Sequence, residues 1–75
     1  GEMEREDDDS VERHYREGET QIQESYRKDG SHAELTLILP NGVQIEASGG
    51  VAMDALKRDL LPLAEQIAAL AREEN

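Results

Sequence analysis

Apolar and polar residues alternate through the stretch LTLILPNGVQIEAS, which runs from Leu35 to Ser48. The dipeptide Asn41-Gly42 near its middle is a strong hairpin signal. A two-residue loop would set apolar residues opposite polar ones, whereas a three-residue loop, Pro40-Asn41-Gly42, sets apolar opposite apolar. Because a slip of one residue turns every side chain to the other face, the pattern favours the longer loop. We therefore expect a hairpin whose apolar face carries Leu35, Leu37, Leu39, Val43 and Ile45.

The segment TQIQESY, from Thr20 to Tyr26, predicts a third strand ahead of this hairpin. Asp29-Gly30 is a candidate two-residue turn between them, and it brings Ile22 and Tyr26 onto the apolar face. Glu24 would also lie on that face, so we expect this strand at the edge of the sheet with Glu24 at the rim. The facing pairs in this register are Tyr26 with Ala33, Glu24 with Leu35, and Ile22 with Leu37.

The residues that follow Gly50 predict a C-terminal helix, since Ser48 and the two glycines after it suit a helix start. Large apolar residues then recur at spacings of three and four, the heptad pattern of helices that pack at a shallow angle. We call this set the predicted seam: Met53, Leu56, Leu60, Leu63, Ile67 and Leu70. A stripe of small residues, Ala64, Ala68 and Ala71, runs beside it. Pro62 interrupts the pattern, so we expect a kink there or a split into two helices.

The N-terminal segment differs in composition from the rest of the chain. Residues 1–19 contain only Met3, Val11 and Tyr15 as sizeable apolar groups, and the run EREDDD is dominated by acidic residues. Like charges repel one another and stay solvated, which is typical of disordered segments. The predicted organisation is a disordered acidic tail over residues 1–19 and a folded module over residues 20–75.

These elements predict an α+β fold: a small antiparallel hairpin or three-stranded meander followed by a C-terminal helix, with the leucine face of the sheet under the seam. Such a core is thin for a chain of 75 residues that has no cysteine for disulfide bonds. The apolar residues also exceed what one sheet face can cover. We therefore expect a homodimer or larger homo-oligomer that shares helices or sheet edges, or else a longer parent protein that covers them.

Charge narrows the choice of partner. Eighteen acidic residues against eight basic ones give a net charge of -10. Nucleic acid and anionic membranes bind basic surfaces, so neither is an expected partner. A basic protein partner fits the charge, although acidic residues also serve solvation alone. The sequence shows no secretory signal and no apolar run of membrane-spanning length, so we expect a cytoplasmic protein.

No residue pattern in the chain indicates catalysis, a cofactor or a metal. His14 and His32 lack partners at ligand spacing, and the run Asp7 to Asp9 lacks the alternation and the glycine of a calcium loop. We therefore expect a non-catalytic protein that needs no cofactor. Its predicted function is a protein-protein interaction or oligomerisation module, a small adaptor or a terminal domain of a larger assembly. The alternative is an acidic inhibitor that mimics nucleic acid and occupies a basic surface of a toxin, nuclease or regulator.

Overall fold

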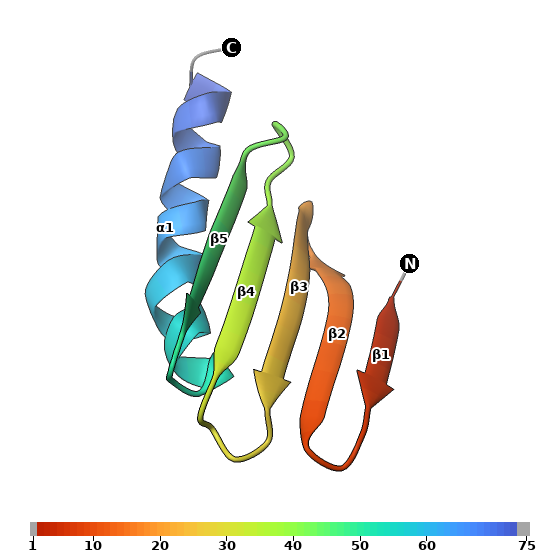
Figure 1. The fold of residues 1–75 in the computed structure, drawn as a ribbon. Helices are drawn as coiled ribbons and strands as arrows, with labels where there is room; N and C mark the ends of the chain where they lie inside the picture. Colours follow the sequence, from red (N-terminus) through yellow and green to blue (C-terminus); the bar gives the residue numbers. More distant parts are fainter. Residues whose placement is uncertain (1, 74–75) are drawn as a thin grey trace.

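Five antiparallel strands form one sheet, and a single helix follows them (Figure 1). The computed structural model describes residues 2–73. The strands lie side by side in chain order, so the sheet is a simple meander. Their bounds are β1 Met3–Glu6, β2 Ser10–Glu17, β3 Thr20–Arg27, β4 Ala33–Ile38 and β5 Gln44–Gly49, and α1 spans Met53–Glu73. The predicted α+β class is confirmed, with five strands rather than two or three.

The hairpin of β4 and β5 has the predicted three-residue loop. The Leu39 N–H donates to the Val43 carbonyl at 2.9 Å, and the Gly42 N–H donates to the Leu39 carbonyl at 2.9 Å. Gly42 has a φ of 87°, the left-handed conformation that a bulged loop of this kind requires. Leu37 faces Ile45 across the ladder, which is the register that the alternation predicts.

Strand β3 pairs with β4 in the predicted register, with Ile22 opposite Leu37 and Tyr26 opposite Ala33. The turn between them is longer than predicted, because the Arg27 N–H donates to the His32 carbonyl and closes a four-residue loop. The expected edge position is wrong, since β3 lies between β2 and β4. Glu24 is therefore not at a rim but buried in the middle of the sheet.

Strands β1 and β2 occupy the segment that was expected to be a disordered tail, and this corrects the predicted boundary at residue 19. Gly18 and Glu19 form a two-residue loop between β2 and β3, and Gly18 has a φ of 63°. Glycine at the first position of such a loop is typical of a type II′ hairpin turn. The turn sets Val11 opposite Tyr26, and both ends of β2 thereby gain apolar neighbours that the segment lacks on its own.

The acidic run between β1 and β2 is a turn. One carboxylate oxygen of Asp7 accepts the backbone N–H of Asp9 at 2.9 Å and that of Ser10 at 2.7 Å. These backbone donors, Asp9 first, and the Ser10 hydroxyl lower the pKa of Asp7. The side chain of Asp7 thus stabilises the turn between β1 and β2. The many acidic residues around it hid this turn signal in the sequence.

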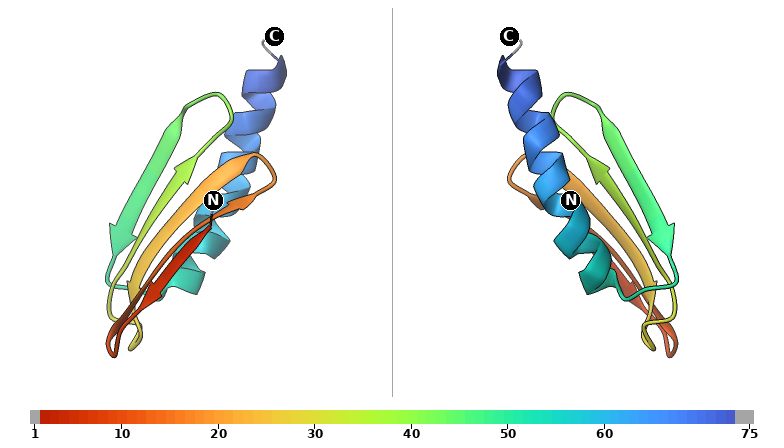
Figure 2. Two further views of the ribbon diagram at one scale, coloured as in Figure 1. Left: turned by 90° about the vertical axis from the view of Figure 1, so that its right-hand side faces the viewer. Right: turned by 90° about the vertical axis from the view of Figure 1, so that its left-hand side faces the viewer.

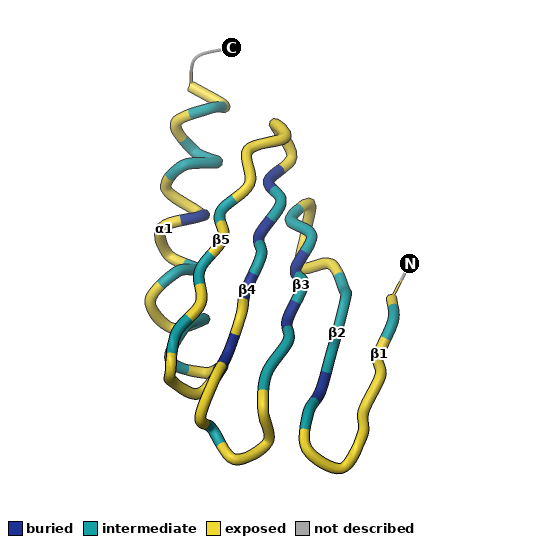
Figure 3. The backbone as a smooth tube through the Cα atoms, in the orientation of Figure 1, coloured by how far each residue is buried: buried dark blue, intermediate teal, exposed yellow. Residues whose placement is uncertain are grey.

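Helix α1 lies along one face of the sheet and leaves the other face uncovered (Figure 2). The core between them is made of Ile22, Ala33, Leu35, Leu37, Leu39, Met53 and Ala64. Figure 3 shows that burial is concentrated in β3 and β4, while β1 is exposed along most of its length. The helix continues through Pro62, so the predicted split into two helices is wrong.

Candidate interaction surface

The predicted seam divides into an inner and an outer part. Met53 is buried, and Leu56, Leu60 and Ile67 are partly buried against the core. The side chains that complete the seam, Leu63 and Leu70, are 43% and 59% exposed. A heptad pattern stays on one line only where helices supercoil, and in a straight helix of 3.6 residues per turn it drifts around the axis. The drift takes Leu63 and Leu70 off the sheet, and Ala64 occupies the buried position instead.

Leu56, Leu63 and Leu70 follow one another at intervals of seven residues along one flank of α1, and we call them the leucine stripe. Lys57 extends toward β3, where it contacts Glu24. At roughly 100° per residue, Leu63 lies about 120° around the helix axis from Lys57. The leucine stripe is therefore on the flank of α1 that is turned away from β3, toward β5.

Strand β5 forms one edge of the sheet. The Leu39 N–H bond to the Val43 carbonyl fixes the phase of the ladder, since hydrogen-bonded and non-hydrogen-bonded pairs alternate in antiparallel sheets. Odd-numbered residues of β5 therefore bond to β4. The N–H and C=O groups of Gln44, Glu46 and Ser48 point outward, away from β4.

The two edges of the sheet differ in protection. At the opposite edge, β1 is short and carries Glu4, Arg5 and Glu6, and charged side chains discourage further strand pairing. Along β5 the only charged residue is Glu46, and the helix-facing positions are Ile45 and Ala47. The edge formed by β5 is thus the one suited to accept another strand.

The predicted apolar face of the sheet is partly covered. Leu35, Leu37 and Leu39 are buried under α1, and Ile45 packs against the core from its margin. Val43 is 40% exposed, and Val51, which follows β5 in the chain, is exposed to the same extent. With Leu63 and Leu70, these valines make up the exposed large hydrophobic residues of the described chain. They lie on α1 or at the two ends of β5.

The molecule is thin and exposes more surface than a compact chain of its mass. Its extents are 46, 25 and 14 Å, and its radius of gyration is 13.1 Å, against about 11 Å for a compact domain of this length. The accessible surface is 5134 Å² for a mass of 8.4 kDa. The scaling for folded monomers gives about 4,600 Å² at that mass. The accessible surface is thus roughly 500 Å² larger than that of an average folded monomer of this mass.

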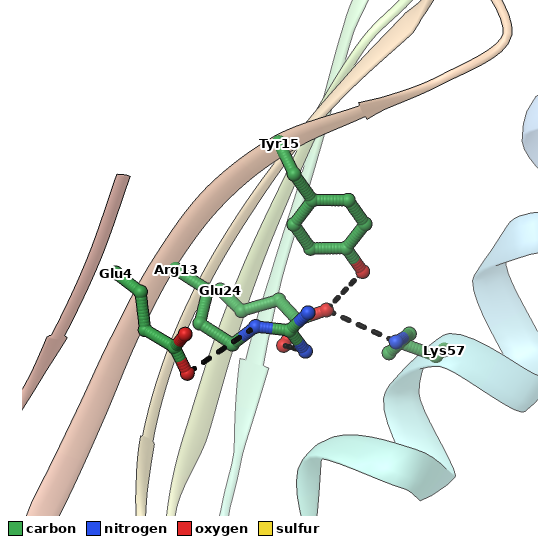
Figure 4. Close-up of polar contacts among 5 residues, drawn as sticks. All are labelled: Glu4, Arg13, Tyr15, Glu24 and Lys57. Carbon is green, nitrogen blue, oxygen red and sulfur yellow. Dashed lines mark hydrogen bonds and ion pairs between the residues drawn. The ribbon is translucent and has the colours of Figure 1, made fainter. Parts of the chain in front are cut away.

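A buried carboxylate joins the helix to the sheet (Figure 4). The Glu24 side chain is 1% exposed, and one of its oxygens accepts the Tyr15 hydroxyl and lies 3.0 Å from the Lys57 ammonium. Arg13 approaches the other oxygen at 3.5 Å and lies over the Tyr15 ring at 4.7 Å. A buried charge is tolerated when it is paired and hydrogen-bonded, so this cluster holds the layers together.

The cluster around Glu24 raises the pKa values of two of its members, Tyr15 and Lys57. Burial raises the pKa of Tyr15, and its hydrogen bond to Glu24 raises it further. Burial lowers the pKa of Lys57, but hydrogen bonds to Tyr15 and Glu24 and the charge of Glu24 outweigh that effect, so the pKa is raised. Both groups therefore keep their protons near neutral pH, and neither is prepared to act as a general base.

The uncovered face of the sheet is polar. It holds a shallow hollow of about 390 Å³. The charged or ionisable side chains around the hollow include Glu12, His14, Glu34 and Glu46. His14 is 3.9 Å from Glu12, and His32 is 3.9 Å from Glu34, both on the exposed surface. These are local ion-pair geometries, and neither histidine lies in an enclosed site.

Residues 2–73 show no metal-binding cluster, no unpaired buried polar side chain and no membrane-spanning helix. No group of three or more histidine, aspartate or glutamate side chains there could hold a metal ion. No buried side-chain nitrogen or oxygen in the described part of the chain lacks a hydrogen-bond partner. Across the same residues, no helix has the length and apolar character needed to cross a membrane.

Sequence reasoning did not find the cluster of Arg13, Tyr15, Glu24 and Lys57. Its members come from three separate elements, and only the register of β2 against β3 brings Arg13 opposite Glu24. The usable signal was the Gly18-Glu19 turn, because pairing outward from it predicts that contact. The misplaced Glu24 in an otherwise apolar set was a second signal that a buried cation was missing.

Comparisons with protein-family models, with curated proteins and with solved structures found no match to this chain.

Proposed function

We propose that the chain is a non-catalytic module for protein-protein interaction or oligomerisation, and that its binding surface is the leucine stripe of α1 together with the open edge of β5. The observation that carries this proposal is the exposure of Leu63 and Leu70 on the flank of α1 nearest β5. Exposed apolar groups that gather beside an unpaired strand edge are typical of interaction sites.

Two further features support an interaction role. The molecule is thin, with extents of 46, 25 and 14 Å, and it exposes more surface than an average monomer of its mass. A strand edge supplies main-chain hydrogen bonds, and the neighbouring apolar groups supply burial, which is the combination used in strand addition. A cytoplasmic location suits this module, because a chain without cysteine has no need of an oxidising compartment.

A pull-down from the native host tests the proposal. The disruptive variant is the pair Leu63→Asp and Leu70→Asp, which places charge on the stripe at positions exposed enough to leave the fold intact. The matched control is the pair Arg58→Gln and Arg72→Gln, which changes net charge equally at exposed positions away from the stripe. The aspartate pair should lose the bound protein and the control should retain it, at low and at high salt. Equal recovery by both variants would reject the surface.

The second candidate function is the acidic inhibitor, and the hollow on the uncovered sheet face is the observation that favours it. Glu12, Glu34 and Glu46 line this hollow and could meet the cations of a basic protein. Against it, several N-terminal acids are paired with bases, as in the 2.6 Å contact of Glu6 with Lys28. An inhibitor of this kind should lose binding steeply as salt rises, and the substitutions Glu12→Gln and Glu34→Gln should abolish it.

A further inference from the structure

We infer that the partner of the proposed surface is a second copy of this chain, and that the two copies join by antiparallel pairing of β5 with β5 about a twofold axis at Ala47. The inference rests on the proposed function and names the occupant of its surface. It predicts a continuous sheet through both chains, with both helices on the same face.

The outward groups of β5 restrict the possible registers. In an antiparallel ladder the hydrogen-bonded pairs must be outward-pointing residues on both chains, here Gln44, Glu46 and Ser48. A twofold axis at Glu46 would set that carboxylate against its own copy, and like charges directly opposite are destabilising. An axis at Ile45 would leave the end of β5 unpaired. An axis at Ala47 keeps the ladder from Ile45 to Gly49 and sets Glu46 opposite Ser48 of the second copy.

The same register gathers exposed apolar groups. It places Ala47 against itself and Ile45 beside Gly49 of the second copy, where the missing side chain leaves room. At each end of the ladder, Val43 meets Val51 of the second copy. Both valines are 40% exposed in the single chain, and the pairing would cover them.

The twofold symmetry determines how the two helices of the dimer lie relative to each other. In Figure 1, α1 runs back along β5 in the opposite direction, and Figure 2 shows it on one face only. A twofold axis perpendicular to the sheet therefore brings the two helices onto that face in antiparallel orientation. Each leucine stripe lies on the flank of α1 nearest β5, so it is turned toward the second copy across the axis. Its spacing of seven residues is the one that helix pairs use.

Area and charge both fit self-association. Each chain has roughly 500 Å² more accessible surface than an average folded monomer of its mass, so two chains together have surface to spare for the roughly 1,000 Å² that a specific interface must bury. The chain carries a net charge of -10, but few acidic residues lie in the proposed contact. They are Glu46 on β5 and Asp59 beside the leucine stripe. The repulsion between copies thus arises outside the contact. Because salt screens such repulsion, the dimer should tighten as salt rises.

Cysteine cross-linking tests the register, because the natural chain has no cysteine. Residues at a non-hydrogen-bonded antiparallel pair lie about 4.5 Å apart between Cα atoms, within the range of a disulfide. The variant Ala47→Cys should form a disulfide-linked dimer under mild oxidation at least about tenfold faster than Glu34→Cys, since the paired thiols have a high effective concentration. Glu34 is exposed on β4, away from the edge, and serves as the matched control.

A second pair of variants tests the edge without altering the core. Glu46→Pro removes an outward N–H, which the ladder with β4 does not use, and Glu46→Ala removes only the side chain. Sedimentation should show a dimer for the natural chain and for Glu46→Ala at micromolar concentration. Glu46→Pro should raise the dimer dissociation constant about tenfold or more, as expected for main-chain hydrogen bonds lost on both copies.

Two results would overturn the inference: a chain that sediments as a monomer at every concentration, or a dimer in which Ala47→Cys cross-links no faster than Glu34→Cys. Neither result touches the proposed function, which is decided by whether Leu63→Asp with Leu70→Asp abolishes capture of any protein from the host, the host's own copy of this chain included. A monomer whose capture is lost in that variant would keep the interaction surface and assign it to another protein.

Discussion

The ammonium group of Lys57 lies 3.0 Å from the carboxylate of Glu24, and this contact fastens α1 to the central strand β3. Removing the cation leaves Glu24 with the Tyr15 hydroxyl and a longer contact to Arg13. Loss of one partner from a buried pair is strongly destabilising, and the remaining partners reduce the effect. We therefore expect Lys57→Met to lower the free energy of unfolding by about 2 kcal/mol.

Chemical denaturation of matched variants measures this effect. The exposed pair of Lys28 and Glu6, 2.6 Å apart, is the control, and Lys28→Met should cost less than about 1 kcal/mol because solvent screens the contact. The double variant Glu24→Leu with Lys57→Met should recover most of the lost stability, since it removes the buried charge as well. Equal losses for Lys28→Met and Lys57→Met would contradict the structural role of Glu24.

The same cluster makes the fold sensitive to alkali. The pKa values of Tyr15 and Lys57 are raised above 10.0 and 10.5, so the folded chain holds these protons to higher pH than the unfolded chain. Their contribution is complete below pH 10 and is lost as pH rises through the raised values. Stability should fall above pH 10, and Lys57→Met should flatten that fall. A denaturation series across pH would contradict this if the two proteins had parallel alkaline limbs.

At acidic pH the dependence is reversed, and stability should fall as pH decreases. The pKa values of Asp7 and Asp29 are lowered below 3.8, by backbone N–H groups at Asp7 and by Ser31 at Asp29. The stabilising effect of these two turns is present above that value and is lost as pH falls below it. Both carboxylates are exposed, so solvent screens these interactions and the loss of stability, measured by denaturation at decreasing pH, should be small.

Much of the sheet could be predicted because its signals are local. The alternation from Leu35 to Ile45 set the register, and Asn41-Gly42 after a proline set the loop. Strand β2 could not be found in the same way, since Arg13 stands between Val11 and Tyr15 and breaks their alternation. Arg13 fits the helix-facing side only because Glu24 is opposite, a contact between strands that no single segment reveals.

Prediction of the helix from the sequence was limited for a different reason. The spacing of leucines is a correct description of the chain, but a seam exists only where a partner helix imposes supercoiling. Against a sheet the straight helix presents Ala64 inward and leaves Leu63 and Leu70 exposed. The predicted contact of the seam with the sheet is therefore found for Met53, Leu56, Leu60 and Ile67, and it fails only for Leu63 and Leu70 among the predicted seam residues.

Gly42 provides a test of the bulged loop. Its φ is 87°, and a side chain added there would meet no atom within 4 Å, so the cost of substitution is conformational. Gly42→Ala should lower stability by about 1 kcal/mol, the usual penalty for a left-handed residue with a side chain. Gly50→Ala is the control, because Gly50 lacks a positive φ and has ordinary contacts. Equal stability of the two variants would argue against the left-handed loop.

Pro62 lies inside a continuous helix and its side chain is exposed. It cannot donate a hydrogen bond to the carbonyl of Arg58, and its ring crowds that carbonyl. Since the helix is not split, Pro62→Ala should raise the free energy of unfolding by about 2 kcal/mol, within the range for an interior proline. Thermal denaturation gives the answer, and a lower melting temperature for the variant would indicate that the proline sets an angle the packing needs.

Truncation separates the roles of the first two strands. Strand β1 is exposed and pairs only with β2, so removal of residues 1–8 should leave a folded protein with a modest loss of stability. Removal of residues 1–19 also deletes β2, which carries Arg13 and Tyr15, and it leaves Glu24 buried with Lys57 as its remaining partner. The exposed edge of β3 would then present Ile22 to solvent beside an incompletely paired carboxylate. We expect the shorter truncation to retain dispersed amide resonances and the longer one to aggregate or unfold. A folded protein lacking β2 would show that β3, β4, β5 and α1 suffice, in agreement with the predicted boundary at residue 19.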